Sequence, residues 1–161
     1  MGQLVDPLTG LAHESYTLMK VDDEAKRAQR YGDDLGLLIV QIDNYDQLSK
    51  QYGVDVADEA VLDIAGVFLC ESRDVDIAGR SADARFLLLM PRTDEPGAQI
   101  VAERFREVLG KRELVADGEM VALKLSVGAV SIRGGGAEKL SRDLLLSRAE
   151  ENRRFGRTPS V

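Results

Sequence analysis

The chain has 161 residues, of which 44% are hydrophobic and 30% are charged, and its formal net charge is −7 at pH 7. This length and composition predict one globular domain built around a single core. The negative charge argues against nucleic acid as a general partner, because polyanions are bound by a surplus of lysine and arginine.

The first half of the chain predicts a helix, a strand and a second helical region. Residues 13–31 are rich in helix formers whose apolar members recur near a 3.6-residue period. Residues 35–42 form a nearly continuous apolar run, which is typical of a strand covered on both faces. From about residue 46 the pattern becomes helical again, with one apolar stripe over residues 60–68. Because Gly53 interrupts this region, we expect two helical pieces.

The third quarter predicts a hairpin and a helix. Strands at about residues 75–80 and 85–90 are separated by about four residues, which is hairpin spacing. Pro91 closes the second strand, and Pro96-Gly97 precedes the helix. One face of that helix is expected to be apolar, formed by Val101, Ala102, Phe105, Val108 and Leu109.

The last quarter predicts a hairpin, a long strand and a final helix. A turn around Asp117-Gly118 leads into one strand over Val121–Ile132. The final helix, at about residues 138–153, is expected to bury three leucines: Leu140, Leu144 and Leu145. The whole pattern predicts a single α/β domain with mixed strand directions and helices packed on the sheet.

Several residue types exclude other functions. The single cysteine, Cys70, rules out an internal disulfide and indicates a reducing compartment. Cys70 ends a helical pattern, so we interpret it as a half-buried structural thiol. His13 has no second histidine or cysteine nearby, which argues against a metal site or a catalytic triad. A basic patch near the end is interpreted as a solvated helix end; it comprises Arg148, Arg153, Arg154 and Arg157.

Membrane insertion and secretion are not predicted. The longest apolar runs, residues 35–40 and 86–90, are far too short to cross a bilayer. Residues 1–6 lack the basic start and apolar stretch of a secretory signal. We therefore expect a cytoplasmic domain that makes no membrane contact.

Short motifs along the chain resemble one known family. In chain order they are Asp6-Pro7-Leu8-Thr9-Gly10-Leu11, Ile39-Val40-Gln41-Ile42-Asp43-Asn44-Tyr45, Tyr52-Gly53, Asp58-Glu59, Ser126-Val127-Gly128-Ala129, Arg148-Ala149-Glu150 and Gly156-Arg157. Read together, they resemble the GGDEF family of diguanylate cyclases along nearly the whole chain. The resemblance implies one nucleotidyl-cyclase-like α/β (α+β) domain over residues 1–161, with a central, mixed, mostly antiparallel five-stranded sheet surrounded by helices. It also implies a piece of a longer bacterial signalling protein with attached or partner domains.

The family signature is altered at the positions that carry the chemistry. Arg80-Ser81-Ala82-Asp83-Ala84-Arg85-Phe86 stands where the family has R-[YF]-G-G-[DE]-E-F. Members of the family join two GTP molecules into cyclic di-GMP with divalent ions held by carboxylates. The resemblance places two metal-ligand positions at Gln41 and Ala84. An amide is a poor Mg²⁺ ligand beside a carboxylate, and a methyl group is none, so no catalytic Mg²⁺ is expected.

The nucleotide site is altered as well. Ala82 and Asp83 replace the glycines that let the hairpin approach the phosphates, and Asp83 adds negative charge there. Arg85 is a further altered position of the signature. Ser49 stands where the family uses Asn to read guanine, and Arg153 is a poorer counterpart of the phosphate-binding Lys than Arg157. The residues that remain of a nucleotide site are Asp43, Asp58 and Arg157.

A second site of the family is retained in sequence. The product-inhibition motif R-x-x-D matches Arg73 and Asp76, with Asp76 six residues before Ala82. The family's further arginine corresponds to Arg104. A guanidinium suits the O6 and N7 edge of guanine or a phosphate, and a carboxylate can accept from guanine N1–H and N2–H₂. The resemblance therefore implies cyclic di-GMP as a ligand. The alternative is that Arg73 and Asp76 form a surface ion pair without a ligand.

Four functions remain open. The first is an inactive receptor for cyclic di-GMP, in which a bound ligand pair could also bridge two subunits into a homodimer. The second is a protein-interaction or dimerisation module without nucleotide affinity. The third is a regulatory domain that binds GTP without turnover. The fourth is residual cyclase activity, which lacks its metal ligands.

Overall fold

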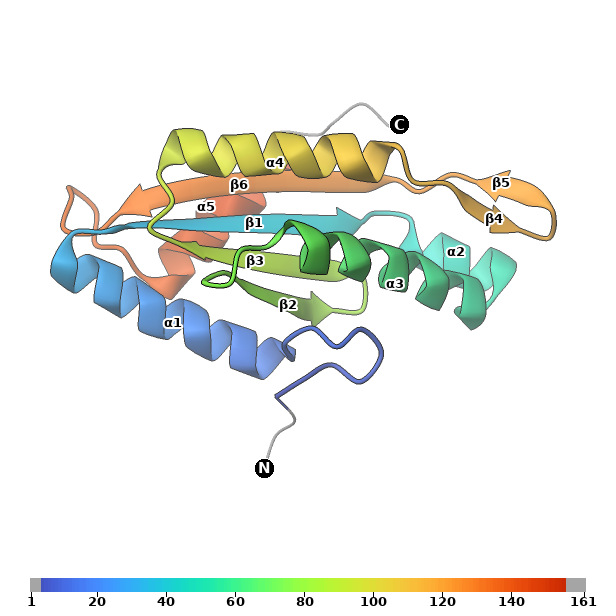
Figure 1. The fold of residues 1–161 in the computed structure, drawn as a ribbon, viewed down its shortest axis with the longest axis horizontal. Helices are drawn as coiled ribbons and strands as arrows, with labels where there is room; N and C mark the ends of the chain where they lie inside the picture. The colour runs from blue at the N-terminus through green and yellow to red at the C-terminus, as the bar shows by residue number, and fades with distance from the viewer. Residues whose placement is uncertain (1–3, 156–161) are drawn as a thin grey trace.

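The computed structural model describes residues 4–155, which form five helices and six strands. Figure 1 shows them in chain order. Their bounds are α1 (Glu14–Tyr31), β1 (Asp34–Ile42), α2 (Tyr45–Tyr52), α3 (Val54–Glu71), β2 (Ile77–Ala82), β3 (Arg85–Pro91), α4 (Glu95–Gly110), β4 (Leu114–Ala116), β5 (Glu119–Val121), β6 (Leu125–Arg133) and α5 (Arg142–Phe155). The expected break in the second helical region is confirmed, because α2 ends and α3 begins at Gly53, whose φ is 94°.

The sheet differs from the one expected. In residues 4–155 it has four strands in the order β2-β3-β1-β6, and every pair of neighbours is antiparallel. The predicted single α/β domain with a mostly antiparallel sheet is confirmed, but the fifth strand and the mixed direction are not. Residues 114–116 and 119–121, β4 and β5, form a separate two-stranded hairpin. The expected strand over Val121–Ile132 is also divided. Residues 122–124 lie in neither β5 nor β6, and their backbone bonds instead to Asp43 and Asn44.

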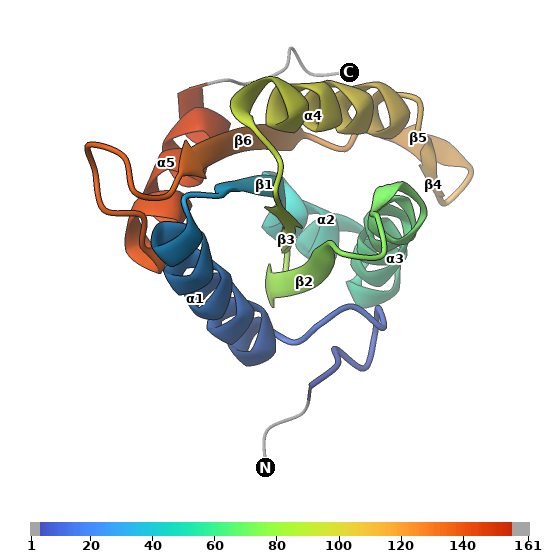
Figure 2. The same cartoon turned by 60° about the vertical axis from the view of Figure 1, so that its left-hand side comes forward.

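Both faces of the sheet are covered, as the continuous apolar run of β1 predicts. Leu38 and Val40 pack with α3 and α4, whereas Leu37 and Ile39 pack with α1 and α5. These side chains alternate because successive residues of a strand point to opposite faces. Figure 2 shows the two layers of helices on either side of the strands. The central strand thereby joins two hydrophobic clusters into one domain.

The end of the chain departs from its predicted pattern. Helix α5 begins at Arg142, so Leu140 is buried just before the helix, and Leu144 is only half-buried. The residues that α5 buries are Leu145, Ala149 and Arg153. The prediction that Arg153 belongs to a solvated patch was therefore wrong.

Helix α5 approaches β6 very closely, and a glycine makes this possible. A Cβ atom added at Gly128 would collide with the backbone of Asn152 and Arg153. The absence of a side chain at Gly128 lets the last turns of α5 lie directly against the strand. This contact places Glu150 and Arg153 beside the end of β1.

Two remaining expectations concern the exposure of Cys70 and membrane-spanning helices. Cys70 is exposed, not half-buried as the sequence suggested. Its position near the end of α3 turns its side chain away from the apolar stripe that ends at Phe68. Among residues 4–155 no helix is both long and apolar enough to cross a membrane.

Candidate functional site

The altered signature forms a tight hairpin between β2 and β3. Ala82 pairs with Arg85, so Asp83 and Ala84 make the turn, and the register shifts between Arg80 and Ala82. The Arg80 guanidinium donates to the Asp83 carbonyl at 2.6 Å and lies 3.3 Å from the Asp6 carboxylate. Arg80 therefore fixes the turn and joins it to the N-terminal motif.

Asp6 organises that motif. Its carboxylate accepts from the Thr9 backbone N–H at 3.0 Å and from the Thr9 hydroxyl at 2.6 Å. Burial raises the pKa of Asp6, but the Thr9 hydrogen bonds and the charge of Arg80 outweigh it and hold the pKa below its usual range. The motif therefore has a structural role in the described residues, where it anchors the chain start to the signature hairpin.

An open pocket of about 340 Å³ lies at this hairpin, and we call it the signature pocket. It is lined by Gln41, Ile42, Asp43, Tyr45, Asp46, Ala82, Asp83, Ala84 and Arg85. Burial raises the pKa of Tyr45, and the nearby charge of Asp83 raises it further. Three lining carboxylates against one lining guanidinium make the pocket a poor environment for a polyphosphate.

Beside the pocket, two arginines and two acids form a connected set that we call the charge network. Arg85 on β3 pairs with Glu150 on α5, and Glu150 also pairs with Arg153. Arg153 Nη1 donates to the Ser126 hydroxyl at 2.7 Å, and that hydroxyl donates to Asp43 Oδ1 at 2.9 Å. Arg153 also lies 3.5 Å from Asp43. The network thus connects β1, β3, β6 and α5.

The charge network pairs Asp43, which lines the signature pocket, and Glu150, which lies beside it, with guanidinium groups. Arg153 is only 8% exposed, and a buried guanidinium requires carboxylates around it. The Gln41 side-chain amide also donates to Asp43, at 3.3 Å. Within residues 4–155, no group of three or more His, Cys, Asp or Glu side chains is placed to hold a metal ion.

Sequence reasoning did not identify this network. Arg85 was recognised only as an altered position, and Glu150 and Ser126 only as motif matches. The one signal was the positive charge of Arg85 at a signature position that is acidic in the family, because such a cation needs an acidic partner. Its partner could not be chosen from sequence, since Glu150 is 65 residues away.

The other residues of the expected nucleotide site are dispersed or undescribed. Asp58 is half-buried on α3 and does not line the signature pocket, although its charge acts on Tyr45. Ser49 lies near the end of α2, where its carbonyl accepts from Gly53. Arg157 lies outside the described residues.

Arg73 and Asp76 form a hydrogen-bonded pair in the loop between α3 and β2. Arg73 Nη2 donates to Asp76 Oδ1 at 2.8 Å and to the Thr93 hydroxyl at 2.7 Å. The Asp76 side chain is 3% exposed, whereas that of Arg73 is 53% exposed. The hydrogen bond to Asp76 raises the pKa of Arg73. The edge of the guanidinium formed by Nε and Nη2 is therefore occupied by Asp76, Thr93 and the Pro91 carbonyl, while the side chain as a whole stays half-exposed.

Arg104 lies next to this loop. It projects from α4 and lies 3.4 Å from Glu71, the last residue of α3, two positions before Arg73. Its side chain is 48% exposed. Arg73 and Arg104 therefore border the same end of α3. Large exposed apolar side chains occur on the same elements: Leu69, Val75 and Ile100.

The four-stranded antiparallel sheet, the signature hairpin and the helices on both faces define an α/β domain of the nucleotidyl-cyclase type. The family model for the diguanylate cyclase GGDEF domain matches residues 3–153, and the chain belongs to this family.

Individual relatives agree with this assignment. The response regulator PleD of Caulobacter vibrioides is 32% identical over 150 residues, which cover 92% of this chain and 32% of PleD. The chain thus spans about a third of that relative. The structure of the diguanylate cyclase SiaD of Pseudomonas aeruginosa, in complex with its activator SiaC, has a TM-score of 0.83 at 30% identity, covering 96% of this chain and 60% of SiaD. The structure of the GGDEF domain of DgcB from Caulobacter crescentus, in complex with c-di-GMP, has a TM-score of 0.82 at 23% identity. The match covers 98% of this chain and 93% of the DgcB domain.

Proposed function

We propose that this domain is a catalytically inactive GGDEF domain that binds cyclic di-GMP through Arg73, Asp76 and Arg104. The observation that carries the proposal is the pair of half-exposed guanidinium groups at the same end of α3, one of them oriented by a buried carboxylate. A guanidinium group can form bidentate hydrogen bonds with the guanine edge or with a phosphate, and it can stack on a base. The solved structure of DgcB with c-di-GMP supports this ligand for the fold.

The contents of the signature pocket support the proposal that the domain is inactive. The two metal-ligand positions hold Gln41 and Ala84, and the neighbouring acids Asp43 and Glu150 are already paired with Arg153. A metal would have to displace these guanidinium contacts before it could bind. Incubation with GTP and Mg²⁺ or Mn²⁺ should yield no cyclic di-GMP by product analysis, and formation of authentic cyclic di-GMP would overturn the inactive assignment.

Ligand binding is tested by calorimetry against cyclic di-GMP and GTP side by side. Arg73→Ala should weaken cyclic di-GMP binding by about 1.5–3 kcal/mol, the scale of a lost charged hydrogen bond. Arg148→Ala is the matched control, because Arg148 is also a partly exposed arginine in an ion pair, on α5. Equal isotherms for wild type and Arg73→Ala would remove Arg73 from the site.

The remaining alternatives give different results in the same experiment. A GTP-binding regulatory domain would bind GTP and not cyclic di-GMP. A protein-interaction or dimerisation module would bind neither, and its association state, measured by light scattering, would not respond to nucleotide. The exposed Leu69, Val75 and Ile100 are the specific observation that favours a protein-contact surface at this end of the domain.

A further inference from the structure

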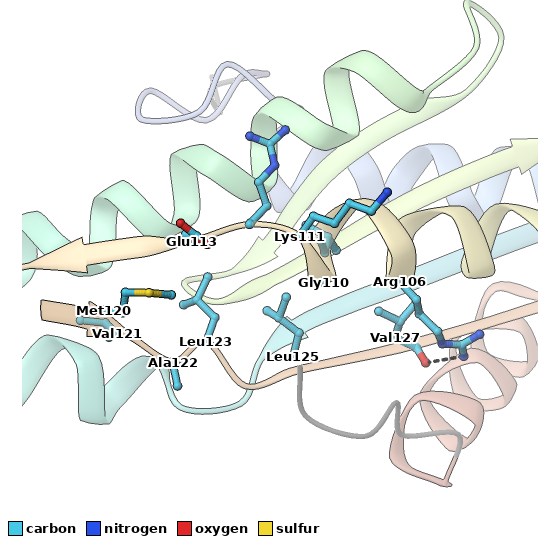
Figure 3. Close-up of a pocket in the computed structure, with 12 residues that line it drawn as sticks. Arg106, Gly110, Lys111, Glu113, Met120, Val121, Ala122, Leu123, Leu125 and Val127 are labelled. Atoms are coloured by element: carbon cyan, nitrogen blue, oxygen red, sulfur yellow. Dashed lines mark hydrogen bonds between the residues drawn. The ribbon is translucent and has the colours of Figure 1, made fainter.

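A second and larger cavity, of about 470 Å³, lies at the base of the β4–β5 hairpin, and we call it the hairpin cavity (Figure 3). It separates the segment 110–113, which leaves α4, from the segment 121–125, which enters β6. Strand pairing starts only at Leu114 and Val121. The two segments therefore run beside each other without forming a ladder.

Segment 121–125 is kept apart from segment 110–113 by hydrogen bonds to the loop between β1 and α2. The Asn44 side chain donates to the Ala122 carbonyl at 2.9 Å and accepts from the Lys124 N–H at 3.0 Å. Asp43 N–H donates to the Lys124 carbonyl at 2.7 Å. Because these groups face the β1–α2 loop, the backbone of Leu123 between them makes no hydrogen bond with the rest of the described chain. The cavity thus results from these hydrogen bonds of the fold.

The inside of the hairpin cavity is mainly apolar. Leu123 and Leu125 point from the lower segment in Figure 3 toward Gly110 and Lys111. Leu109 and Val127 complete this apolar wall. A volume of 470 Å³ falls within the range of about 300–1,000 Å³ that is typical of small-molecule sites, which are also largely apolar with a few polar groups.

One lining cation of the cavity is available to an anionic ligand. Its lining contains three basic residues and one acid, Glu113, on a protein whose net charge is −7. Arg112 lies 3.1 Å from Asp63, so its charge is compensated by an acid outside the lining. Arg106 lies 3.2 Å from Glu103 and donates to the Val127 carbonyl at 3.2 Å, so it too is paired. The Lys111 ammonium has no ion pair or side-chain hydrogen bond with other described residues. It is the lining cation that a ligand could take as its partner.

We propose that the hairpin cavity binds a small amphiphilic carboxylate, with its alkyl chain against Leu123 and Leu125 and its carboxylate at Lys111. The apolar wall would remove the alkyl chain from water, and the lysine would select the charge of the head group. This site is separate from the signature pocket and from Arg73, and it does not depend on the cyclic di-GMP proposal.

The test uses decanoate as the probe and the whole chain as the protein. Backbone amide NMR shifts are followed during titration, with acetate as the short anion and decyltrimethylammonium as the cation of similar chain length. We expect saturable shifts at residues 110–113 and 121–125 with decanoate alone. Lys111→Glu should weaken decanoate binding about ten-fold or more, as expected for a lost charged contact.

Lys124→Glu is the matched control, because it makes the same charge change on an exposed residue that does not line the cavity. The affinity of this variant for decanoate should stay within about two-fold of the wild-type affinity, since an exposed charge outside the site contributes little. Leu123→Ser tests the apolar wall independently of charge and should also weaken binding.

Three results would overturn the proposal. The first is the absence of saturable shifts with decanoate. The second is equal binding of decyltrimethylammonium, which would show no selection for an anion. The third is an equal loss in Lys111→Glu and Lys124→Glu, which would show a non-specific charge effect. Binding of an acidic leucine-containing peptide without binding of decanoate would instead identify a peptide surface and likewise reject the small carboxylate.

Discussion

Arg85 shows how a cation is accommodated in the lining of the signature pocket. The family resemblance leads one to expect an acid at this position, and a cation placed beside other cations would be unfavourable. Glu150 pairs with both Arg85 and Arg153, so it lies at the centre of the charge network. Removing this one carboxylate would leave two guanidinium groups without their shared partner.

We predict that Glu150→Gln destabilises the domain by about 1–3 kcal/mol, because an amide leaves the charges of Arg85 and of the buried Arg153 uncompensated. The measurement is urea unfolding at pH 7. Glu151→Gln, at the adjacent exposed position, is the control and should change stability by less than about 0.5 kcal/mol. Similar midpoints for the two variants would show that the network contributes nothing to stability.

Asp6 predicts a pH dependence. Its pKa is lower in the folded protein than in the unfolded chain, so its contribution is present above about pH 4 and is lost as the pH falls through the folded value. Asp6→Asn should therefore cost about 1–2 kcal/mol at pH 7 and progressively less at pH 3 and below.

Urea unfolding of wild type and Asp6→Asn at several pH values measures this difference. Asp22→Asn is the control, since Asp22 is on the surface of α1 in an exposed pair with Lys26. If the difference in free energy of unfolding between wild type and Asp6→Asn stayed constant from pH 7 to pH 3, it would contradict the assigned direction of the pKa shift.

At the scale of elements, the contact between α5 and β6 decides whether the network can form. Both Glu150 and Arg153 belong to α5, and Asp43 and Ser126 lie at the ends of β1 and β6. The helix reaches them only because Gly128 carries no side chain. The glycine of the late S-V-G-A motif is therefore explained by packing.

We predict that Gly128→Ala destabilises the domain by about 2 kcal/mol or more, because the new methyl group meets helix backbone that cannot rotate away. Thermal unfolding is the measurement. Gly66→Ala is a matched control within α3, where an added Cβ meets nothing within 4 Å. That substitution should be neutral or stabilising by up to about 1 kcal/mol, as alanine is the better helix former. A Gly128→Ala protein as stable as Gly66→Ala would refute the close approach.

In the molecule as a whole, the two cavities lie on either side of one connection. Ala122 and Lys124 are hydrogen-bonded to the β1–α2 loop, whose residue Asp43 lines the signature pocket. Ala122 and Leu123 line the hairpin cavity. The loop between α3 and β2 that carries Arg73 is separate from both linings. The signature pocket, the hairpin cavity and the Arg73 loop are thus three distinct regions of the domain.

The occupied acids of the signature pocket lead to a prediction for the whole domain. Adding millimolar Mg²⁺ or Mn²⁺, or removing metal with EDTA, should shift the unfolding temperature by less than about 1 °C, because a ligand stabilises a protein only by binding its folded state. Differential scanning calorimetry is the measurement, and KCl at matched ionic strength controls for charge screening. A clear rise in unfolding temperature with Mn²⁺ but not with KCl would show that a metal site survives.

Much of the fold follows from local pattern. The apolar run of β1, the helical stripe ending at Phe68, the break at Gly53 and the signature hairpin all depend on neighbours in sequence. The strand count and the division at residues 122–124 did not follow, because an apolar stretch continues through Leu123 and only the bonds to Asn44 interrupt the strand.

The candidate sites were likewise predictable from the sequence only in part. The family motifs, the Arg73–Asp76 spacing, and the presence of Gln41 and Ala84 where the family resemblance implies metal ligands can all be read from the chain, because each is a matter of residue identity and register. The burial of Arg153 and its sharing of Glu150 with Arg85 became visible only in the folded domain. The reason is physical: a charge can be buried only where the fold brings an opposite charge to it, and these partners come from elements far apart in the chain.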